Sequence, residues 1–208
     1  MIKGIRHIIF DLGGVLLNID YQLTETAFVE LGITNFAELY SQLKQTPVFD
    51  DFETGRLSRA EFVRALQDLA PVPLTEEQVC AAWNAMLLDL PLRRLQLLQQ
   101  LRIHYDLILL SNTNEVHEEA FNRIILDSHG ANLGTYFDKV YYSHRVGMRK
   151  PMQDLFRRVL EENGFLAQHT LFIDDSPQHI EAAKATGIHA VYLEKGMTIE
   201  DDIFKPKA

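Results

Sequence analysis

The stretch FDLGGVLLNID, residues 10–20, decides how this chain folds and where its chemistry lies. It follows HII, and the apolar run of the strand ends at Asp11, with two glycines behind it at Gly13 and Gly14. A short apolar run that ends in this way is typical of a strand buried on both faces of a sheet. Asp11 then stands at the carboxyl end of that strand. Position 13, where a second acid could assist it, holds Gly13.

Further segments resemble HIIF (7–10), and helical patterns separate them. The strand-like segments are DLILLS (106–111), KVYYS (139–143), TLFID (170–174) and IHAVYL (188–193), and the helical patterns cover 114–126, 152–164 and 177–186. Strands that alternate with helices indicate a parallel sheet with crossover connections. The sequence therefore predicts an α/β fold, a Rossmann-like parallel sheet between two layers of helices.

The segment from 18 to 88 interrupts this alternation. It holds no strand-like run, and its helical patterns cover 21–31, 35–45, 59–69 and 75–88. Ser58 and Glu61 have the spacing of a capping box, and Thr75 can cap the next helix. We expect residues 1–17 and 89–208 to form the α/β core domain, with 18–88 inserted as a helical subdomain. Because it leaves from the end of the first strand, the insertion should cover the crevice beyond the strand ends as a cap.

Composition excludes several classes of protein. The chain of 208 residues has a formal net charge of −9 and one cysteine, Cys80. The negative charge and the lack of a Lys/Arg-rich run disfavour nucleic-acid binding, and one cysteine allows no intramolecular disulfide. No stretch approaches the roughly 20 apolar residues of a membrane span. We therefore expect a cytoplasmic protein, a monomer by default, that acts on a small molecule.

The polar residues gather at the predicted strand ends. They are Asp11, Ser111 with Asn112, Lys150 in GMRKP, and Asp174 with Asp175. Carboxylates that lie close together raise one another's pKa, and a Mg²⁺ ion held by oxygen ligands relieves this conflict. The DDSP segment can also cap a helix, but one acid would suffice for that, so the pair favours a metal site.

The other strand ends indicate anion binding. Ser111 and Asn112 offer a hydroxyl, backbone N–H groups and a helix start, which together bind phosphate or merely cap a helix. Lys150 is held between a turn and a helix start, where it is placed to neutralise a phosphate.

The order of these motifs resembles the haloacid dehalogenase-like (HAD) hydrolase superfamily over almost the whole chain. FDLGGVL, LSNTN, GMRKP and FIDD resemble its bacterial sugar phosphatases of the α-glucose-1-phosphatase type, and the insertion resembles its helical C1 caps. The resemblance implies a Mg²⁺-dependent hydrolase of a small phosphorylated metabolite, which forms an aspartyl-phosphate on the nucleophile Asp11. The other implied roles are phosphate binding by Ser111, Asn112 and Lys150, catalytic charge stabilisation by Lys150, and metal binding by Asp11, the Gly13 carbonyl, Asp174 and Asp175.

Gly13 departs from the pattern of typical phosphatases in this superfamily, which carry an acid/base Asp at this position. Such an acid contributes roughly 10²–10⁴-fold. Three explanations are open: a phosphatase that is slow or acts on good leaving groups such as a sugar 1-phosphate, a metal-independent haloacid dehalogenase, or a phospho-ligand binder without turnover. The first is favoured, because the metal-binding acids are present.

Several other residues carry smaller expectations. His179 is expected on a helix surface, although it could face the site as a substitute base, and Asp20 could replace the missing acid. FDDFETGR (49–56) in the cap is expected to set specificity through its acids and Arg56. Trp83 is expected in the cap's core rather than on a sugar face.

Overall fold

The core of the molecule is a five-stranded parallel sheet. The computed structural model describes residues 2–40 and 47–205. The strands are β1 (His7–Phe10), β2 (Asp106–Ser111), β3 (Lys139–Tyr142), β4 (Thr170–Asp174) and β5 (His189–Tyr192), and they lie in the order β3-β2-β1-β4-β5. β1 pairs with both β2 and β4, which confirms the expected α/β sheet and places the Asp11 strand at its centre.

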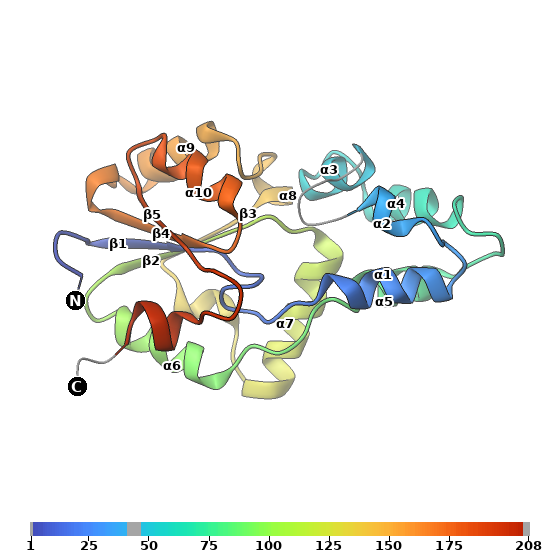
Figure 1. Cartoon of the computed structure of the whole chain (residues 1–208), viewed down its shortest axis with the longest axis horizontal. Helices are drawn as coiled ribbons and strands as arrows, with labels where there is room; N and C mark the ends of the chain where they lie inside the picture. Colours follow the sequence, from blue (N-terminus) through green and yellow to red (C-terminus); the bar gives the residue numbers. More distant parts are fainter. Residues whose placement is uncertain (1, 41–46, 206–208) are drawn as a thin grey trace.

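Helices cover both faces of the sheet (Figure 1). They are α6 (Leu92–Leu101), α7 (Glu115–His129), α8 (Ser143–Val146), α9 (Gln153–Asn163) and α10 (Pro177–Lys184), with short helical turns η1 (Leu133–Tyr136), η2 (Ala167–His169) and η3 (Ile199–Ile203). Alternate strand residues face the two layers. Ile8 and Phe10 pack in the cluster that includes α6 and α7 side chains, and Ile9 packs in the cluster with α9 and α10 side chains. The central strands β1, β2 and β4 are therefore buried on both faces, as their apolar runs indicate, whereas the edge strands β3 and β5 are only partly buried.

The insertion forms a group of helices beside the sheet (Figure 1). Its helices are α1 (Tyr21–Glu30), α2 (Phe36–Leu39), α3 (Pro47–Glu53), α4 (Arg59–Gln67) and α5 (Glu76–Asn84). They share an apolar cluster in which Trp83 is fully buried. The two capping boxes, Ser58 with Glu61 and Thr75 with Gln78, are both formed.

Two details of the expected helices differ from the structure. The pattern over 35–45 gives only the short helix α2, and residues 41–46 lie outside the described residues. The acidic stretch before Gly55 forms helix α3, because Phe49 and Phe52 on one of its faces pack into the Trp83 cluster.

The insertion joins the core through a neck of two antiparallel segments. The Asn18 N–H donates to the Asp89 carbonyl at 2.8 Å, and the Leu88 N–H donates to the Asn18 carbonyl at 3.0 Å. An isolated bridge between Ile19 and Leu87 continues this pairing. Both ends of the insertion therefore leave the sheet at one place.

Further contacts hold the cap against α7 and α8. The Arg59 guanidinium binds Glu119 at 3.0 Å, and the Arg59 N–H donates to Glu115 at 2.7 Å. Gly55 has a φ of +68°, and a Cβ there would lie 2.3 Å from the His144 carbonyl oxygen. A glycine is required at this point because it adopts positive φ without strain and lets the two backbones approach.

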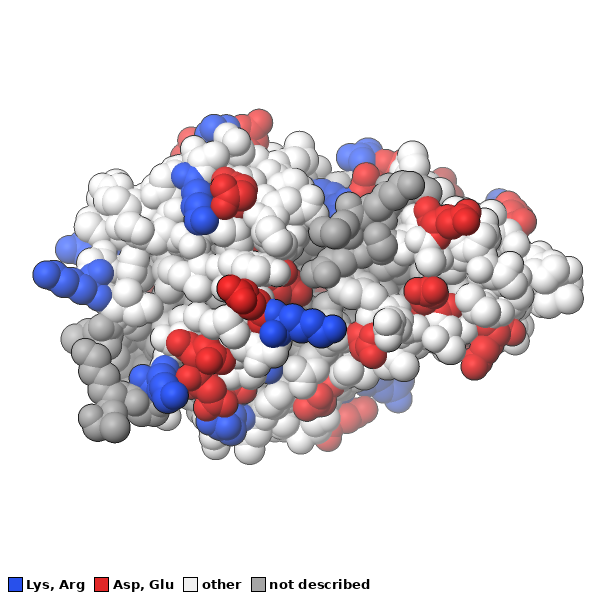
Figure 2. Space-filling view, viewed as in Figure 1, with Lys and Arg blue, Asp and Glu red and all other residues white. Residues whose placement is uncertain are grey.

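The surface drawn in Figure 2 carries acidic and basic side chains interspersed, with several acidic ones over the cap. Among the described residues, no helix is both long and apolar enough to cross a membrane.

Candidate active site

Three neighbouring strands place the predicted site residues at one edge of the sheet. Asp11 follows β1 directly, Ser111 is the last residue of β2, and Asp174 is the last residue of β4. Phe10 pairs in register with Leu109 of β2 and with Ile173 of β4, so these strand ends are level. The short helix α8 and the turn after it bring Lys150 to the same place.

Lys150 forms the electrostatic centre of the site. Its side chain is fully buried, and its Nζ lies 2.8 Å from Asp11 Oδ1 and 2.6 Å from Asp174 Oδ2. Burial lowers the pKa of Lys150, but Asp11 and Asp174 outweigh it and raise the pKa above its usual value. The ammonium therefore stays charged in a buried position that two carboxylates share.

The Asn112 side chain holds the backbone of Lys150. Its amide Nδ2 donates to the Lys150 carbonyl at 2.9 Å, and its Oδ1 accepts from the Lys150 N–H at 2.9 Å. This two-way contact fixes the backbone from which the Lys150 side chain extends. The Asn112 side chain is thus a positioning group for Lys150, and its main chain is the part that stays a predicted phosphate ligand.

Asp174 is surrounded by donors. Oδ1 accepts from the Ser176 N–H at 2.8 Å and lies 3.0 Å from His179 Nδ1, while Oδ2 takes the Lys150 ammonium. Burial raises the pKa of Asp174, but Lys150 and His179 overcome it and hold the pKa at about 2. Asp174 is thus an ionised anchor for Lys150 and His179, and its metal ligation stays a prediction.

The pKa of Asp11 shifts in the opposite direction to that of Asp174. Burial and then the charge of Asp174 raise its pKa well above the usual value, Asp175 adds to this, and Lys150 only partly offsets it. Asp11 Oδ1 also accepts from the Leu12 N–H at 2.7 Å. A carboxylate that burial and two neighbouring acids destabilise fits a site for a divalent cation.

Asp175 lies against the backbone of the glycine pair. A Cβ on Gly14 would lie 2.3 Å from Asp175 Oδ2, and Gly14 has a φ of +74°. The glycine thus opens the space for the Asp175 carboxylate. Asp11, Asp174 and His179 also place ligand atoms within 4.8 Å of one another. The Lys150 ammonium bridges Asp11 and Asp174, so its charge disfavours a cation directly between them. Asp11 and Asp175 both line the pocket, and their carboxylates are the hard oxygen ligands that suit Mg²⁺.

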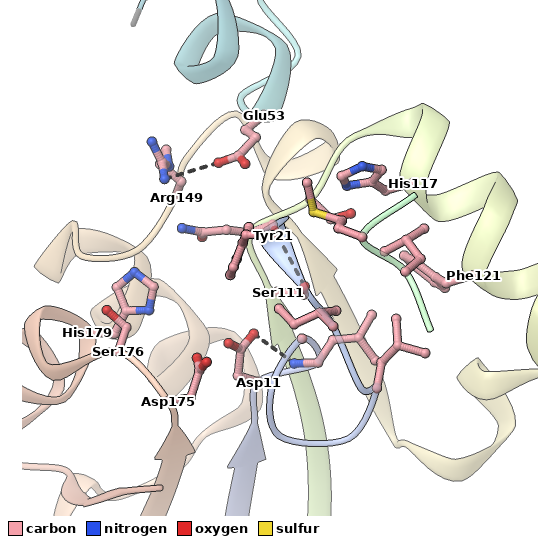
Figure 3. A pocket seen from close by; sticks show the side chains of 18 of the residues that line it. Asp11, Tyr21, Glu53, Ser111, His117, Phe121, Arg149, Asp175, Ser176 and His179 are labelled. Carbon is pink, nitrogen blue, oxygen red and sulfur yellow. Dashed lines mark hydrogen bonds and ion pairs between the residues drawn. The ribbon is translucent and has the colours of Figure 1, made fainter. Parts of the chain in front are cut away.

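A pocket opens between these strand ends and the cap (Figure 3). Its core side includes Asp11, Gly13, Ser111, Asn112 and Asp175, which confirms that these predicted residues come together. Lys150 and Asp174 lie behind Asp11, both fully buried. The cap contributes Ile19, Tyr21, Tyr40, Glu53, Met86 and Leu87.

Two residues that line the pocket, His179 and Arg149, were not predicted as site residues from the sequence. The expectation that His179 lies on the helix surface is wrong, because its ring lines the pocket with a side chain only 12% exposed and contacts Asp174. Arg149 lines the pocket as well and pairs with the cap acids Asp50 and Glu53. Both depend on which way a helix or turn faces, which the sequence alone does not give.

Asp20 has a different role from the substitute acid that the sequence suggested. Its carboxylate accepts from the Gln22 N–H at 3.0 Å and caps α1. It lines a neighbouring groove rather than the pocket that holds Asp11.

His117 at the rim of the pocket is a buried neutral imidazole. Its Nε2 lies 3.0 Å from the Trp83 carbonyl, which can only accept, so Nε2 carries the hydrogen and Nδ1 accepts from the Asn114 amide at 3.2 Å. Burial lowers its pKa to about 4. His117 therefore joins the cap helix α5 to α7 and carries no charge near neutral pH.

This imidazole makes stability depend on pH. The unfolded chain binds a proton at His117 below about pH 6.5, whereas the folded protein resists it down to about pH 4, so stability falls as the pH is lowered through this window. We expect a loss of about 3 kcal/mol from this group between pH 7 and pH 4. Urea unfolding of the wild type and His117→Gln at both pH values measures it. Equal pH dependence in the two proteins would contradict the assignment.

Known proteins are similar to this chain in both sequence and fold. The family model of the haloacid dehalogenase-like hydrolases matches residues 5–187. A D-ribitol-5-phosphate phosphatase of Bacteroides thetaiotaomicron is 33% identical over 192 residues, which cover 92% of this chain and 93% of that protein. A HAD family enzyme of the same organism, solved in its wild-type form with magnesium and inorganic phosphate, superposes with a TM-score of 0.87 at 32% identity and covers 97% of this chain and all of that one.

Two other solved structures complete this comparison. A HAD-like hydrolase structure from Porphyromonas gingivalis has a TM-score of 0.87 at 34% identity, with 96% of each chain covered. An L-2-haloacid dehalogenase with a TM-score of 0.60 is only 18% identical and shares the fold alone. The matched family model and the relatives that span nearly the whole chain show that this protein belongs to the haloacid dehalogenase-like hydrolases.

Proposed function

We propose that this protein is a Mg²⁺-dependent phosphatase that hydrolyses the phosphate monoester of a small sugar or polyol. The observation that carries the proposal is the buried Lys150 ammonium between Asp11 and Asp174, with Asp175 beside them at the floor of the pocket. The matches of similar length support it, because they include a D-ribitol-5-phosphate phosphatase and a HAD family structure solved with magnesium and inorganic phosphate.

The proposed reaction has two steps. Asp11 attacks the phosphorus with a carboxylate oxygen, the bond to the leaving oxygen breaks, the leaving alkoxide takes a proton from solvent water because no acid stands at position 13, and an aspartyl-phosphate forms. Water then attacks the phosphorus and gives a proton to the hydroxide left by the first step, the Asp11–phosphate bond breaks, and inorganic phosphate leaves. Lys150 stabilises negative charge near Asp11, and Ser111 with the Asn112 main chain orients the phosphoryl group. Asp11, the Gly13 carbonyl and Asp175, with Asp174 as a further candidate, would hold Mg²⁺, which would supply positive charge for the phosphoryl oxygens.

The cap is part of the proposal. We infer that residues 18–88 act as a cap over the core formed by 1–17 and 89–208. The neck at Asn18 and Leu88, the separate apolar cluster around Trp83 and the cap residues in the pocket wall support this division. The substrate's leaving group then lies between the cap and the strand ends.

Phosphate release with and without Mg²⁺ tests the function. The panel comprises D-ribitol 5-phosphate, glucose 1-phosphate, glucose 6-phosphate and p-nitrophenyl phosphate, with 2-haloacids in a parallel assay. Mg²⁺-dependent release supports the phosphatase. Halide release that resists EDTA, without phosphate release, would establish the alternative of a metal-independent dehalogenase. Silence in both assays with phosphate-ester binding retained would establish the non-catalytic binder.

Gly13 provides a direct test of the missing acid. The nearest atoms to a Cβ at this position belong to the Ile19 side chain, with its terminal methyl at 3.0 Å. We expect Gly13→Asp to increase turnover of glucose 6-phosphate by about 10–100-fold, because a general acid helps most when the leaving group is a poor one. Turnover of p-nitrophenyl phosphate, whose leaving group needs no proton, should change much less.

Gly13→Asn is the matched control, since it has the same size and transfers no proton. Steady-state kinetics of the three proteins on both esters give the comparison. An equal gain in Gly13→Asp and Gly13→Asn, or no gain in either, would show that position 13 does not limit proton transfer.

A further inference from the structure

Among the described cap residues that line the pocket, Glu53 is the one with a charged side chain. It is the last residue of α3, and its side chain is only 7% exposed. Figure 3 shows it extending into the pocket from the cap helix, on the side opposite to Asp11 and Asp175. A group in this position meets the leaving group of a phosphate ester rather than its phosphoryl group.

Arg149 holds this carboxylate in place. Its Nη2 lies 3.1 Å from Glu53 Oε2, and its Nη1 pairs with Asp50, whose side chain is 42% exposed. Asp50 on the same helix already pairs with Arg149, so the connection between the cap and the turn before Lys150 does not depend on Glu53 alone. A second, buried carboxylate is costly to desolvate. A purely structural role therefore does not explain why residue 53 is a charged acid rather than a neutral residue.

The surroundings of Glu53 match a hydroxylated carbon chain. The phenols of Tyr21 and Tyr40 lie in the same cap wall and can both donate and accept hydrogen bonds. Apolar side chains complete the wall, and they can pack on the C–H groups of the same chain. These apolar residues of the cap are Ile19, Met86 and Leu87.

We propose that Glu53, oriented by Arg149, accepts hydrogen bonds from the hydroxyl groups of an acyclic or cyclic polyol phosphate and so selects hydroxylated leaving groups over plain alkyl ones. This inference rests on the proposed phosphatase function and names the residue that gives it specificity. An alkyl leaving group would displace water from the Glu53 carboxylate and offer no hydrogen bond in its place. The free-energy cost of desolvating Glu53 would therefore weaken binding of the alkyl ester and not of the polyol ester.

The test compares two esters with the same length and the same kind of leaving oxygen, D-ribitol 5-phosphate and n-pentyl phosphate. We expect the wild type to prefer the polyol ester in kcat/KM by at least about 100-fold. Glu53→Gln should reduce this preference at least about tenfold, mostly through KM of the polyol ester, since a hydrogen bond to a charged group is weakened.

Two variants on the same helix serve as controls. Asp51→Asn removes an exposed acid that pairs with Arg56 at 2.7 Å outside the pocket, and it should leave the preference unchanged. Asp50→Asn weakens the other partner of Arg149 and should reduce thermal stability while it retains the preference. If Glu53→Gln lowered kcat/KM for both esters equally, together with stability, Glu53 would be a structural link only and the inference would be wrong.

A failure of the proposed function is distinguishable from a failure of this inference. If the wild type released phosphate from neither ester, calorimetric titration of both esters into the wild type and Glu53→Gln would replace the kinetics. Tighter binding of the polyol ester that Glu53→Gln abolishes would support the role of Glu53 in a binding protein. Equal affinities of the wild type for the two esters would overturn it.

Discussion

We expect Asp11→Asn to lose Mg²⁺-dependent phosphate release by at least about 10⁴-fold on every ester of the panel. The amide cannot attack phosphorus to form the acyl phosphate, and no other described carboxylate is placed to replace it, because Lys150 and His179 engage Asp174 and Asp175 lies against Gly14. Single-turnover measurements with p-nitrophenyl phosphate give the size of the loss.

The fold of Asp11→Asn should stay intact. Burial and the neighbouring acids make an ionised Asp11 unfavourable in the metal-free protein, so a neutral side chain of the same shape should melt at least as high as the wild type. Mg²⁺ should raise the melting temperature of the wild type more than that of the variant. Full phosphate release by a folded Asp11→Asn protein would exclude an aspartyl-phosphate at this position.

The second large effect is expected for Lys150→Met. Methionine has a similar length but no charge, so Asp11 and Asp174 would face each other in a buried site without their common partner. Breaking a buried ion pair from one side costs about 3–5 kcal/mol, and loss of a charged group at the reacting phosphoryl group costs about 10²–10³-fold in kcat. Urea unfolding and steady-state kinetics measure the two losses.

A double variant separates these two effects. Lys150→Met with Asp174→Asn removes one of the two carboxylates left without a partner, so it should recover part of the stability but none of the activity. Lys184→Met, at a half-exposed lysine that pairs with Glu181, is the matched control and should change stability by less than about 0.5 kcal/mol. Equal stability losses in Lys150→Met and Lys184→Met would contradict the buried ion pair.

The sequence predicted the central strands β1, β2 and β4 well because each of them is a largely apolar run buried on both faces. It also predicted the start of α4 and α5, because the capping boxes at Ser58 and Thr75 are local patterns. Helix α3 was harder to predict from the sequence. Its apolar residues Phe49 and Phe52 are buried only because they pack in the cluster around Trp83, which is distant in the sequence.

The sequence predicted which residues meet at the site but not how they contact one another. Acids and a lysine at strand ends indicate a common edge, and the structure brings them together. The partners of these residues were not predictable, because Asn112 contacts Lys150 across 38 residues of sequence and Arg149 contacts Asp50 across 99. Such contacts depend on how the sheet and the cap pack, not on spacing along the chain.

The paired neck at Asn18, Ile19, Leu87 and Leu88 has a consequence for how enzymes of this architecture diversify. Because the chain leaves and re-enters the sheet domain side by side, the distance that an inserted segment must span is the same whatever its length or fold. Insertions and deletions between these two points alter what surrounds the leaving group and leave Asp11, Lys150 and Asp174 in register. Substrate range can then evolve by exchange of a module, while the reaction chemistry stays under separate selection.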